Sequence, residues 1–557
     1  MTASKHAQPF PALPAALLAP LALATLALAV PLPARACTSY LVTKGASADG
    51  STFLTYVADS HTLYGDLEVV PAGVHAAGQT IPIYDWDTGR YLGRIPQAPV
   101  TYAVTGLINE FQVAVGETTF GGRKELLDPK GVVDYGSLMR LALQRARTAR
   151  EAIDVMTSLA ETYGYCSEGE SFSIADPNEA WILEMVGRGP GGKGALWAAV
   201  RVPDGYVSAH ANMSRIRQFP LGDPKNALHS KDVIQYARDR GWFTGVDADF
   251  SFADAYYPRG FGGMRFCDSR VWRFFMRVAP GLKLTTDWVK GVLGAKPLPM
   301  WVKPERKLSV RDVMELMRDH FEGTEFDLST GVGAGPFGLP YRWRPLTWEY
   351  EGKKYFNERS ASTQQTGFSI VAQSRGWLPG PIGGVLWFGV DDTWLTVYVP
   401  MYAGIREAPH AYAPGTGTFK QFSWDAAFWA FNAVSNFTYS RWSDMSKDVR
   451  DAQAALEGSF IAAVREADVA ALKQFKEAPG LARDYLTAFS ATQAERTMTR
   501  WHALFQELLV KYLDGNVRDA LGEVQHPPYP KEWYGRIVGE RPGAFEVQKI
   551  PGEIEEE

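Results

Sequence analysis

The stretch PLPARA at residues 31–36 is followed by CTSYLVTKGASADGSTFLTYVADSH at residues 37–61. The first part is typical of the end of an export signal, and the second opens on Cys37. If cleavage occurs between Ala36 and Cys37, the mature chain begins with a residue that carries both a free α-amine and a thiol. One residue then supplies both a nucleophile and a base, and the question is whether the rest of the chain builds a pocket around Cys37.

Residues 1–36 have the three parts of a secretory signal. Lys5 lies near the start, the apolar run Ala15–Val30 follows, and Ala34-Arg35-Ala36 is an A-x-A-like cleavage site. The alternative is an uncleaved membrane anchor. The apolar run is shorter than about 20 residues and is interrupted by Pro20, so it is short for a membrane span. We therefore expect a cleaved signal peptide, and no stable membrane insertion after cleavage.

A lipoprotein is the second alternative, because a cysteine follows the cut. Lipoprotein signals usually carry Leu three residues before that cysteine, whereas this chain has Ala34. A lipid on the Cys37 sulfur would also abolish any nucleophile. The expected location is therefore exported, either periplasmic or secreted.

The composition is that of a globular protein. The chain has 557 residues, of which 46% are hydrophobic and 21% are charged, and its formal net charge is -5. It has no run of Lys and Arg, so nucleic acid is not an expected partner. Three cysteines in an exported chain leave at least one unpaired. Cys166 and Cys267 are able to pair, or they are small buried hydrophobic residues.

The order of predicted elements is strands, then helices, then strands again. Residues 39–43 and 51–58 are predicted strands on either side of the turn at Asp49-Gly50. A helix over 137–147 is followed by another that begins at Thr148, with Glu151 placed for a capping box. Further strands are predicted at 172–175, 180–186, 195–202, 205–208, 366–373, 384–389 and 393–399. This order favours sheets packed with helices in layers over alternating βαβ units.

The rest of the chain gives weaker signals. Residues 215–305 contain one clear predicted helix, near 231–239, and Ser309 is expected to cap another. The C-terminal part is predicted to be helical, and an apolar stripe runs along its last long helix at Met498, Trp501, Phe505, Leu508 and Tyr512. We interpret this stripe as a face that docks on the body of the protein.

An amino-terminal cysteine is chemically suited to amide hydrolysis. A thiol with a pKa near 8.5 is only a few per cent thiolate at neutral pH. An α-amine titrates near pKa 8, so it is able to take the thiol proton and return it to a leaving amine. A carboxylate would orient that amine, and amide or guanidinium donors would hold the oxyanion. The alternative is that Cys37 merely follows the cleavage site.

An ordered set of short blocks resembles one known family. Cys37-Thr38, Asp49-Gly50-Ser51-Thr52 and Asp59 are similar to the start of N-terminal-nucleophile (Ntn) cysteine hydrolases. Residues 106–110 and 113–116 resemble the next block of these hydrolases. Later blocks resemble the cysteine dipeptidase family of that superfamily: residues 171–174, 176–177, 179–181, 183–184, 197–199, 201–204, 211–212, 387–389 and 398–400. The blocks stand in the family's order and cover most of residues 37–405.

The resemblance implies an α+β fold of the four-layer αββα type and metal-free hydrolysis of peptide bonds, typically in dipeptides. Cys37 would be the nucleophile, and Asp59 matches the carboxylate near it. Asn212 matches an amide position that would help to hold the oxyanion, and Arg270 resembles a later arginine that supports the charge state of the nucleophile. The implied organisation is a signal at 1–36, a catalytic domain at 37–420 and a helical C-terminal extension at 421–557 packed on that domain.

Each of these matches has a plainer alternative. Asp59 could form a surface ion pair with His61, Asn212 could cap a turn, and Arg270 could pair with a structural carboxylate. No histidine has a close metal-binding spacing such as H-E-x-x-H, so we expect no metal and no cofactor.

The chain departs from the superfamily's pattern at two places. Tyr56 and Val57 stand where Arg-Asn often precedes the aspartate, and Glu117-Thr118 stands where Asn-Glu is usual. These changes bear on substrate preference more than on the nucleophile. Tyr56, Glu117 and Arg123 are therefore our candidates for substrate contacts.

The sequence thus predicts an exported cysteine peptidase that hydrolyses dipeptides or short peptides through an acyl-enzyme on Cys37. The first alternative is the same machinery acting on another amide, such as an N-acyl amino acid, a bile-salt conjugate or a penicillin side chain. The second is a non-enzymatic exported binding protein. A homo-oligomer is compatible with the sequence, which does not address it.

Overall fold

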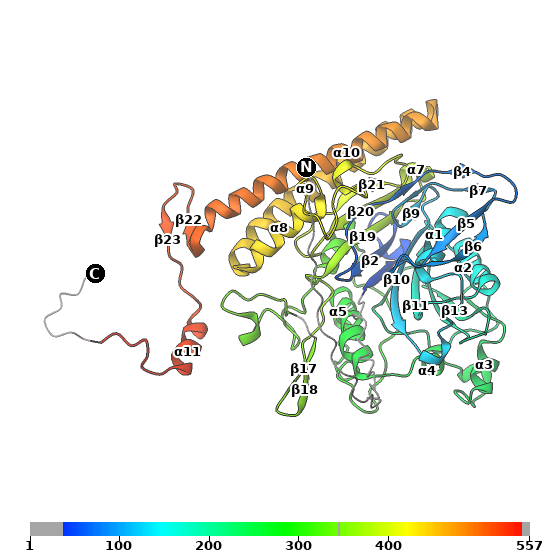
Figure 1. The fold of residues 1–557 in the computed structure, drawn as a ribbon, viewed down its shortest axis with the longest axis horizontal. Coiled ribbons are helices and arrows are strands. Elements are labelled where there is room, and N and C mark those ends of the chain that lie inside the picture. Colours follow the sequence, from blue (N-terminus) through cyan, green and yellow to red (C-terminus); the bar gives the residue numbers. More distant parts are fainter. Residues whose placement is uncertain (1–36, 344–345, 549–557) are drawn as a thin grey trace, which may run out of the picture. The chain divides into compact units, whose positions relative to one another are not determined.

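The computed structural model describes residues 37–343 and 346–548. It is a mixture of helices and antiparallel sheets, as the sequence predicts, and two large sheets form its centre (Figure 1). The predicted signal at 1–36 lies outside the described residues. None of the helices in the part that the structure describes has the length and hydropathy needed to cross a bilayer.

The first large sheet carries the strand that begins just after Cys37. Its seven strands are ordered β16-β14-β1-β2-β19-β20-β21. Their bounds are β1 Ser39–Val42, β2 Thr52–Asp59, β14 Val207–His210, β16 Trp301–Val302, β19 Thr366–Ser374, β20 Gly384–Val390 and β21 Val399–Tyr402. Every pair in this sheet is antiparallel, and the long central pair β2–β19 brings residues more than 300 positions apart into register.

The second large sheet has eight strands, ordered β15-β13-β12-β11-β10-β9-β8-β3. Their bounds are β3 Val69–Val70, β8 Val104–Thr105, β9 Ile108–Asn109, β10 Ala114–Gly121, β11 Gly169–Ala175, β12 Ala180–Gly187, β13 Ala195–Arg201 and β15 Ala227–His229. Smaller two-stranded pairs are β4 Gly73–Val74 with β7 Val100–Thr101, β5 Thr80–Tyr84 with β6 Tyr91–Pro96, β17 Thr347–Tyr350 with β18 Lys353–Phe356, and β22 Val517–Arg518 with β23 Val524–Gln525.

The helices follow the caps that the sequence provides. Asp134 caps α1 by accepting from the Ser137 amide, and Thr148 caps α2 by accepting from the Glu151 amide. The helix bounds are α1 Tyr135–Arg145, α2 Ala149–Tyr163, α3 Val233–Asp239, α4 Phe252–Tyr256, α5 Ser269–Val278, α6 Val310–Met317, α7 Gly380–Gly383, α8 Ala427–Tyr439, α9 Trp442–Glu477, α10 Pro479–Lys511 and α11 Lys531–Glu540. A π-helical turn, η4 Gly263–Asp268, leads directly into α5.

The two large sheets face each other across a buried polar seam. Ser39 of β1 hydrogen bonds to Ser173 of β11 at 2.7 Å between the hydroxyl oxygens. Ser173 in turn bonds to Nε2 of His210, and Nδ1 of that ring bonds to Thr118, each at 2.7 Å. All four side chains are buried. The seam therefore fixes the relative position of the two sheets at Ser39, two residues after Cys37.

A buried ion pair joins the long C-terminal helix α9 to the residue that follows α6. Arg318, just after α6, donates to both carboxylate oxygens of Glu457, and the Glu457 carboxylate also accepts from the Tyr398 amide. On α10, Trp501 stacks on Phe431 of α8 with ring centroids 4.5 Å apart. These contacts fasten the C-terminal helices to one another and to the strands before them.

Two expectations about secondary structure are wrong. Residues 393–398 are not a strand, because the amides of Leu395 and Thr396 bond back to the Asp392 carbonyl and turn the chain before β21. The segment 215–305 contains more than one clear helix, since α5 lies within it. Val271, Phe274, Phe275 and Val278 are buried on α5 at helical spacing, a signal that was available in the sequence.

Candidate active site

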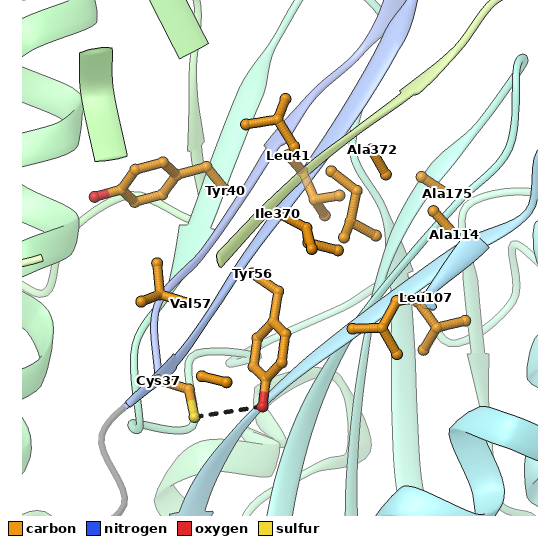
Figure 2. Close-up of a cluster of buried hydrophobic side chains, with 14 of the residues drawn as sticks. Cys37, Tyr40, Leu41, Tyr56, Val57, Leu107, Ala114, Ala175, Ile370 and Ala372 are labelled. Carbon is orange, nitrogen blue, oxygen red and sulfur yellow. Dashed lines mark hydrogen bonds between the residues drawn. The ribbon is translucent and has the colours of Figure 1, made fainter. Parts of the chain in front are cut away.

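Cys37 lies two residues before β1, an interior strand of the first sheet. The next residue, Thr38, bridges to Val57 of β2, whose amide donates to the Thr38 carbonyl at 3.0 Å. The Cys37 side chain is buried and points at the hydroxyl of Tyr56 on the neighbouring strand (Figure 2). The Sγ to Oη distance is 3.7 Å, a hydrogen bond in which the thiol donates. The pairing of β1 with β2 thus brings the nucleophile candidate and Tyr56 together.

Tyr56 also connects the two large sheets. Its hydroxyl donates to Oε1 of Glu117 on β10 at 2.7 Å. Gly116 makes the approach of β10 possible, because a Cβ at that position would lie 3.0 Å from Cβ of Tyr56. Phe368 of β19 packs against the Tyr56 ring edge-on, with centroids 5.8 Å apart. Cys37, Tyr56 and Glu117, which are distant in the sequence, therefore form a continuous hydrogen-bonded chain.

The environment favours the neutral thiol of Cys37. Burial raises its pKa well above the ordinary value, and the Glu117 and Asp59 carboxylates raise it further. Hydrogen bonding to the Asp59 backbone and to Tyr56 lowers the pKa of the thiol and opposes this effect. A nucleophilic thiolate at this position therefore depends on a base that removes the proton.

Arg270 holds the backbone around Cys37. It is on α5, buried, and its Nη1 donates to the Cys37 carbonyl at 2.6 Å and to the Thr38 hydroxyl at 2.7 Å. Its Nε donates to the carbonyl of Phe266 in the π-helical turn at 2.8 Å. The planar guanidinium fork suits this set of acceptors from several segments. These acceptors are carbonyl and hydroxyl oxygens, which does not fit the alternative that Arg270 pairs with a structural carboxylate.

Asn212 lies on the other side of the same guanidinium. Its Oδ1 accepts from Nη2 of Arg270 at 2.9 Å, and its Nδ2 donates to the Thr119 carbonyl at 2.8 Å. The backbone of Asn212 has φ of 61°, in the left-handed region that a few residue types, asparagine among them, tolerate. Arg270 and Asn212 therefore form one hydrogen-bonded unit with Cys37.

Asp59, at the end of β2, is fully buried. Its carboxylate accepts from Arg359 at 2.6 Å and from the Thr366 hydroxyl at 2.6 Å. Burial raises its pKa, whereas the Arg359 charge and the Thr366 hydrogen bond lower it. Burial excludes the alternative of a surface ion pair with His61.

Arg123 is held by a different set of neighbours. Its Nε donates to the Ala255 carbonyl at 2.7 Å, and its guanidinium lies over the Trp242 ring, 4.2 Å from the centroid. Among the described residues, none of the contacts found for Arg123 is with Cys37 or Tyr56. The structure therefore brings together six of the seven candidates and places Arg123 in a separate cluster.

Three side chains of this cluster were not predicted from the sequence. Arg359 and Thr366 bind Asp59, and Glu170 of β11 lies beside Glu117. Arg359 stands in an irregular segment with no pattern around it, so no sequence signal was available. Glu170 precedes the predicted strand at 172–175 and was recognisable only once the register of β10 with β11 was known.

The described residues contain no group of three or more His, Cys, Asp or Glu side chains placed to hold a metal ion. All three cysteines are free thiols, so Cys166 and Cys267 do not pair. Cys37 differs from the other two in its hydrogen-bonded chain to Tyr56 and Glu117.

Comparison with known families adds an independent finding. Residues 79–455 match the model of peptidase family C69, which is more than half of the chain. The chain belongs to peptidase family C69. This membership confirms the family that the sequence blocks resemble, a family of cysteine peptidases. The matched range begins after Cys37, Tyr56 and Asp59, so the roles of these three residues rest on their geometry.

Curated relatives of this C69 peptidase are similar over most of their length. A protein named probable dipeptidase from Salmonella dublin is 26% identical over 408 residues, which is 68% of this chain and 83% of the relative. Another probable dipeptidase, from Latilactobacillus sakei, is 25% identical and covers 76% of this chain and 85% of its own length. A dipeptidase from Bifidobacterium longum is 25% identical over 69% of this chain and 74% of its own.

Proposed function

We propose that this protein is an exported cysteine dipeptidase that works through an acyl-enzyme on Cys37. The names of the curated relatives support a dipeptide substrate, and C69 membership supports peptide hydrolysis. The observation that carries the assignment to Cys37 is its buried sulfur, which contacts Tyr56 while Arg270 binds the carbonyl of the same residue. Neither of the other two cysteines has this pair of contacts.

The proposed reaction has two steps. The Cys37 sulfur attacks the scissile carbonyl carbon, and the C–N bond breaks once the leaving amine has received a proton. Water then hydrolyses the thioester and frees the thiol. In the mature chain the α-amine of Cys37 is a base on the same residue, and Asp59 contributes negative charge beside it.

The oxyanion of the tetrahedral intermediate needs hydrogen-bond donors. We assign this role to Asn212, whose Nδ2 group carries two hydrogens and gives one to the Thr119 carbonyl. Arg270 is placed to orient Asn212 through its Oδ1 and to hold the Cys37 backbone. Arg270 in this proposal positions the nucleophile and supports its charge state.

Tyr56, Glu117 and Arg123 remain our candidates for substrate contacts. Tyr56 is the one that touches Cys37, so it is the first of the three that a bound dipeptide would meet. Glu117 lies behind Tyr56, and Arg123 is 21% exposed in its side chain beside Trp242. Arg123 is therefore proposed for the part of the substrate farther from the scissile bond.

We also propose the finer fold and the domain limits. The helices α1 and α2 pack by the sheet that contains β10 to β13, and α9 and α10 pack by the sheet that contains β19 to β21 (Figure 1). This arrangement supports a four-layer αββα sandwich of the Ntn-hydrolase type. The proposed limits are a cleaved signal at 1–36, a catalytic domain at 37–420 and a helical extension at 421–557. Export to the periplasm or the medium follows from the proposed signal.

The decisive assay uses purified mature protein, whose amino terminus is first sequenced. We expect it to begin at Cys37, to hydrolyse dipeptides, and to act poorly on N-acyl amino acids, bile-salt conjugates and penicillins. Cys37→Ala should lose activity completely, whereas the matched control Cys166→Ala should retain it. A chelator should leave the rate unchanged, in line with a metal-free reaction.

Each alternative has its own outcome in this assay. Preference for an acylated amide over dipeptides would favour the acylase function. Absence of activity on every amide would favour the binding protein. A start at a residue other than Cys37 would contradict the role of its α-amine as the base. Full activity in Cys37→Ala would contradict the role of Cys37 as the nucleophile.

A further inference from the structure

The hydrogen-bonded chain that starts at Cys37 ends at Glu117, and a second buried carboxyl group, that of Glu170, lies beside it. In the register of β10 with β11, Glu170 stands opposite Thr119, and Glu117 stands opposite Phe172. Glu117 and Glu170 are therefore diagonal neighbours on one face of the sheet, within reach of each other's side chains. Both are buried, at 1% exposed area each. Thr119 donates its hydroxyl to Oε1 of Glu170 at 2.8 Å.

The two carboxyl groups are buried diagonal neighbours, and a proton on one of them would allow it to donate to the other. Burial, followed by the Glu117 carboxylate, raises the pKa of Glu170 well above its ordinary value, which agrees with one shared proton. Two adjacent buried carboxylates do not ionise together without a compensating cation. The pair therefore carries one negative charge and one proton.

The direction of each hydrogen bond is fixed by the donors available. The Tyr56 hydroxyl has one proton and donates it to Glu117, so its oxygen accepts from the Cys37 thiol. The chain thus runs from the S–H bond through one O–H bond to a carboxylate. Every link is buried, which excludes bulk water as a competing acceptor.

We propose that Tyr56, Glu117 and Glu170 form a proton relay for the Cys37 thiol, with Glu170 as the positioning residue that holds the shared proton. This inference rests on the proposed role of Cys37 as the nucleophile. The S–H bond breaks as a new O–H bond forms on Tyr56, and the original Tyr56 proton passes to Glu117. The sulfur lone pair forms the C–S bond. On collapse of the intermediate the protons move back, and the leaving nitrogen receives one.

The relay gives the thiol proton a second acceptor besides the α-amine of the mature chain. It also gives a chemical reason for Tyr56 and Glu117 at the positions where the superfamily pattern has other residues. Glu117 then has two opposing effects on Cys37. Its charge raises the thiol pKa, yet it accepts the thiol proton in the reaction.

Other titratable groups lie near the residues of the relay. Asp59 lies near Cys37 on β2, and Tyr135 on α1 lies near Tyr56. The charge of Glu170 raises the pKa of Tyr165, which precedes β11. The charge of Glu168 in turn raises the pKa of Glu170. Of these, the exposed Glu168 offers a matched control, because it is a carboxylate near Glu170 for which no hydrogen bond to the relay is found.

The test compares two rates in the mature enzyme: alkylation of Cys37 by iodoacetamide across pH, and hydrolysis of a dipeptide. Glu117→Gln keeps an acceptor for Tyr56 and removes the charge. We expect faster alkylation at pH 7, because the thiol pKa falls, together with about 100-fold slower hydrolysis, because the proton acceptor is lost. A merely structural or merely electrostatic role would not move the two rates in opposite directions.

Two further variants separate the links. Tyr56→Phe keeps the ring against Phe368 and should slow hydrolysis in an enzyme that remains folded, with a lower melting temperature because the Glu117 carboxylate loses a donor. Glu170→Gln should remove one ionisation from the pH profile of kcat/KM, whereas Glu168→Gln should keep the same number of ionisations. Hydrolysis by Glu117→Gln at or above the wild-type rate, in an enzyme that Cys37→Ala inactivates, would overturn the relay and leave the proposed function intact. Full activity in Cys37→Ala would instead overturn the function itself.

Discussion

Nη1 of Arg270 lies 2.6 Å from the backbone carbonyl oxygen of Cys37, so a buried side chain on α5 fixes the main chain of the candidate nucleophile. The same guanidinium binds the Thr38 hydroxyl and Oδ1 of Asn212. One residue therefore sets the relative positions of the first strand, the Asn212 turn and the π-helical turn before α5.

Replacement of this guanidinium is the first prediction. Arg270→Lys keeps the charge but loses the planar fork, so several buried acceptors lose their donor. We expect kcat/KM to fall at least tenfold and the free energy of unfolding to fall by about 2–4 kcal/mol, measured by urea denaturation. The control is Arg277→Lys, on the same helix and 29% exposed, which should change both quantities little. Equal effects of the two substitutions would contradict a special role for Arg270.

Gly116 gives a prediction about the contact between the sheets. In Gly116→Ala the new methyl group would lie 3.0 Å from Cβ of Tyr56 and 3.2 Å from Cδ2 of Leu54. We expect a loss of about 1–3 kcal/mol of stability from overpacking, and lower activity because Tyr56 is displaced from Cys37. Gly222→Ala is the matched control, since nothing lies within 4 Å of a Cβ there. Unchanged activity in Gly116→Ala would show that Tyr56 tolerates displacement.

His210 in the seam predicts acid sensitivity. Burial lowers its pKa from 6.5 to about 3, with Arg215 adding to the effect, so the folded protein keeps the ring neutral. The unfolded chain binds the proton first as the pH falls, so the stabilising contribution of His210 is complete above pH 6.5 and is lost towards pH 3. Between pH 7.5 and 4.5 the loss is roughly 3 kcal/mol.

The measurement for this prediction is the difference in unfolding free energy between the wild type and His210→Gln at the two pH values. The difference isolates His210 from the other buried acids, which titrate in both proteins. We expect the advantage of the wild type to shrink on acidification. A difference that stays constant with pH would mean that the ring titrates equally in the folded and unfolded states.

The Arg318–Glu457 pair predicts how the C-terminal helices contribute to stability. Both side chains are buried, so Glu457→Ala leaves Arg318 with only the partly exposed Glu315 as an ion-pair partner and removes the acceptor of the Tyr398 amide; it should cost about 3–5 kcal/mol. Glu466→Ala, exposed on the same helix α9, should stay within about 0.5 kcal/mol of the wild type. The double variant Arg318→Met with Glu457→Leu should recover part of the loss in thermal denaturation. No recovery would point to a role of the charges beyond their mutual pairing.

Much of the local structure was available in the sequence. The turn at Asp49-Gly50, the caps at Thr148 and Ser309, and the apolar stripe around Trp501 are short-range patterns, and the structure contains the elements they predict. Capping and amphipathic spacing act over a few residues, so the order of residues is sufficient to reveal them. The turn that begins at Asp392 is an exception, because the apolar residues beyond it have the spacing of a strand.

The sequence by itself determined the family, the candidate nucleophile and the order of strands, helices and strands, because these depend on residue order and short spacings. Only the tertiary structure decided the surroundings of Cys37. Arg359 reaches Asp59 from 300 positions away, and Glu170 meets Glu117 through the register of two strands. Sheet pairing and the burial that shifts each pKa arise when distant segments pack together. Cys37 could thus be predicted as the nucleophile from the sequence, whereas the charged groups around it are set by the fold.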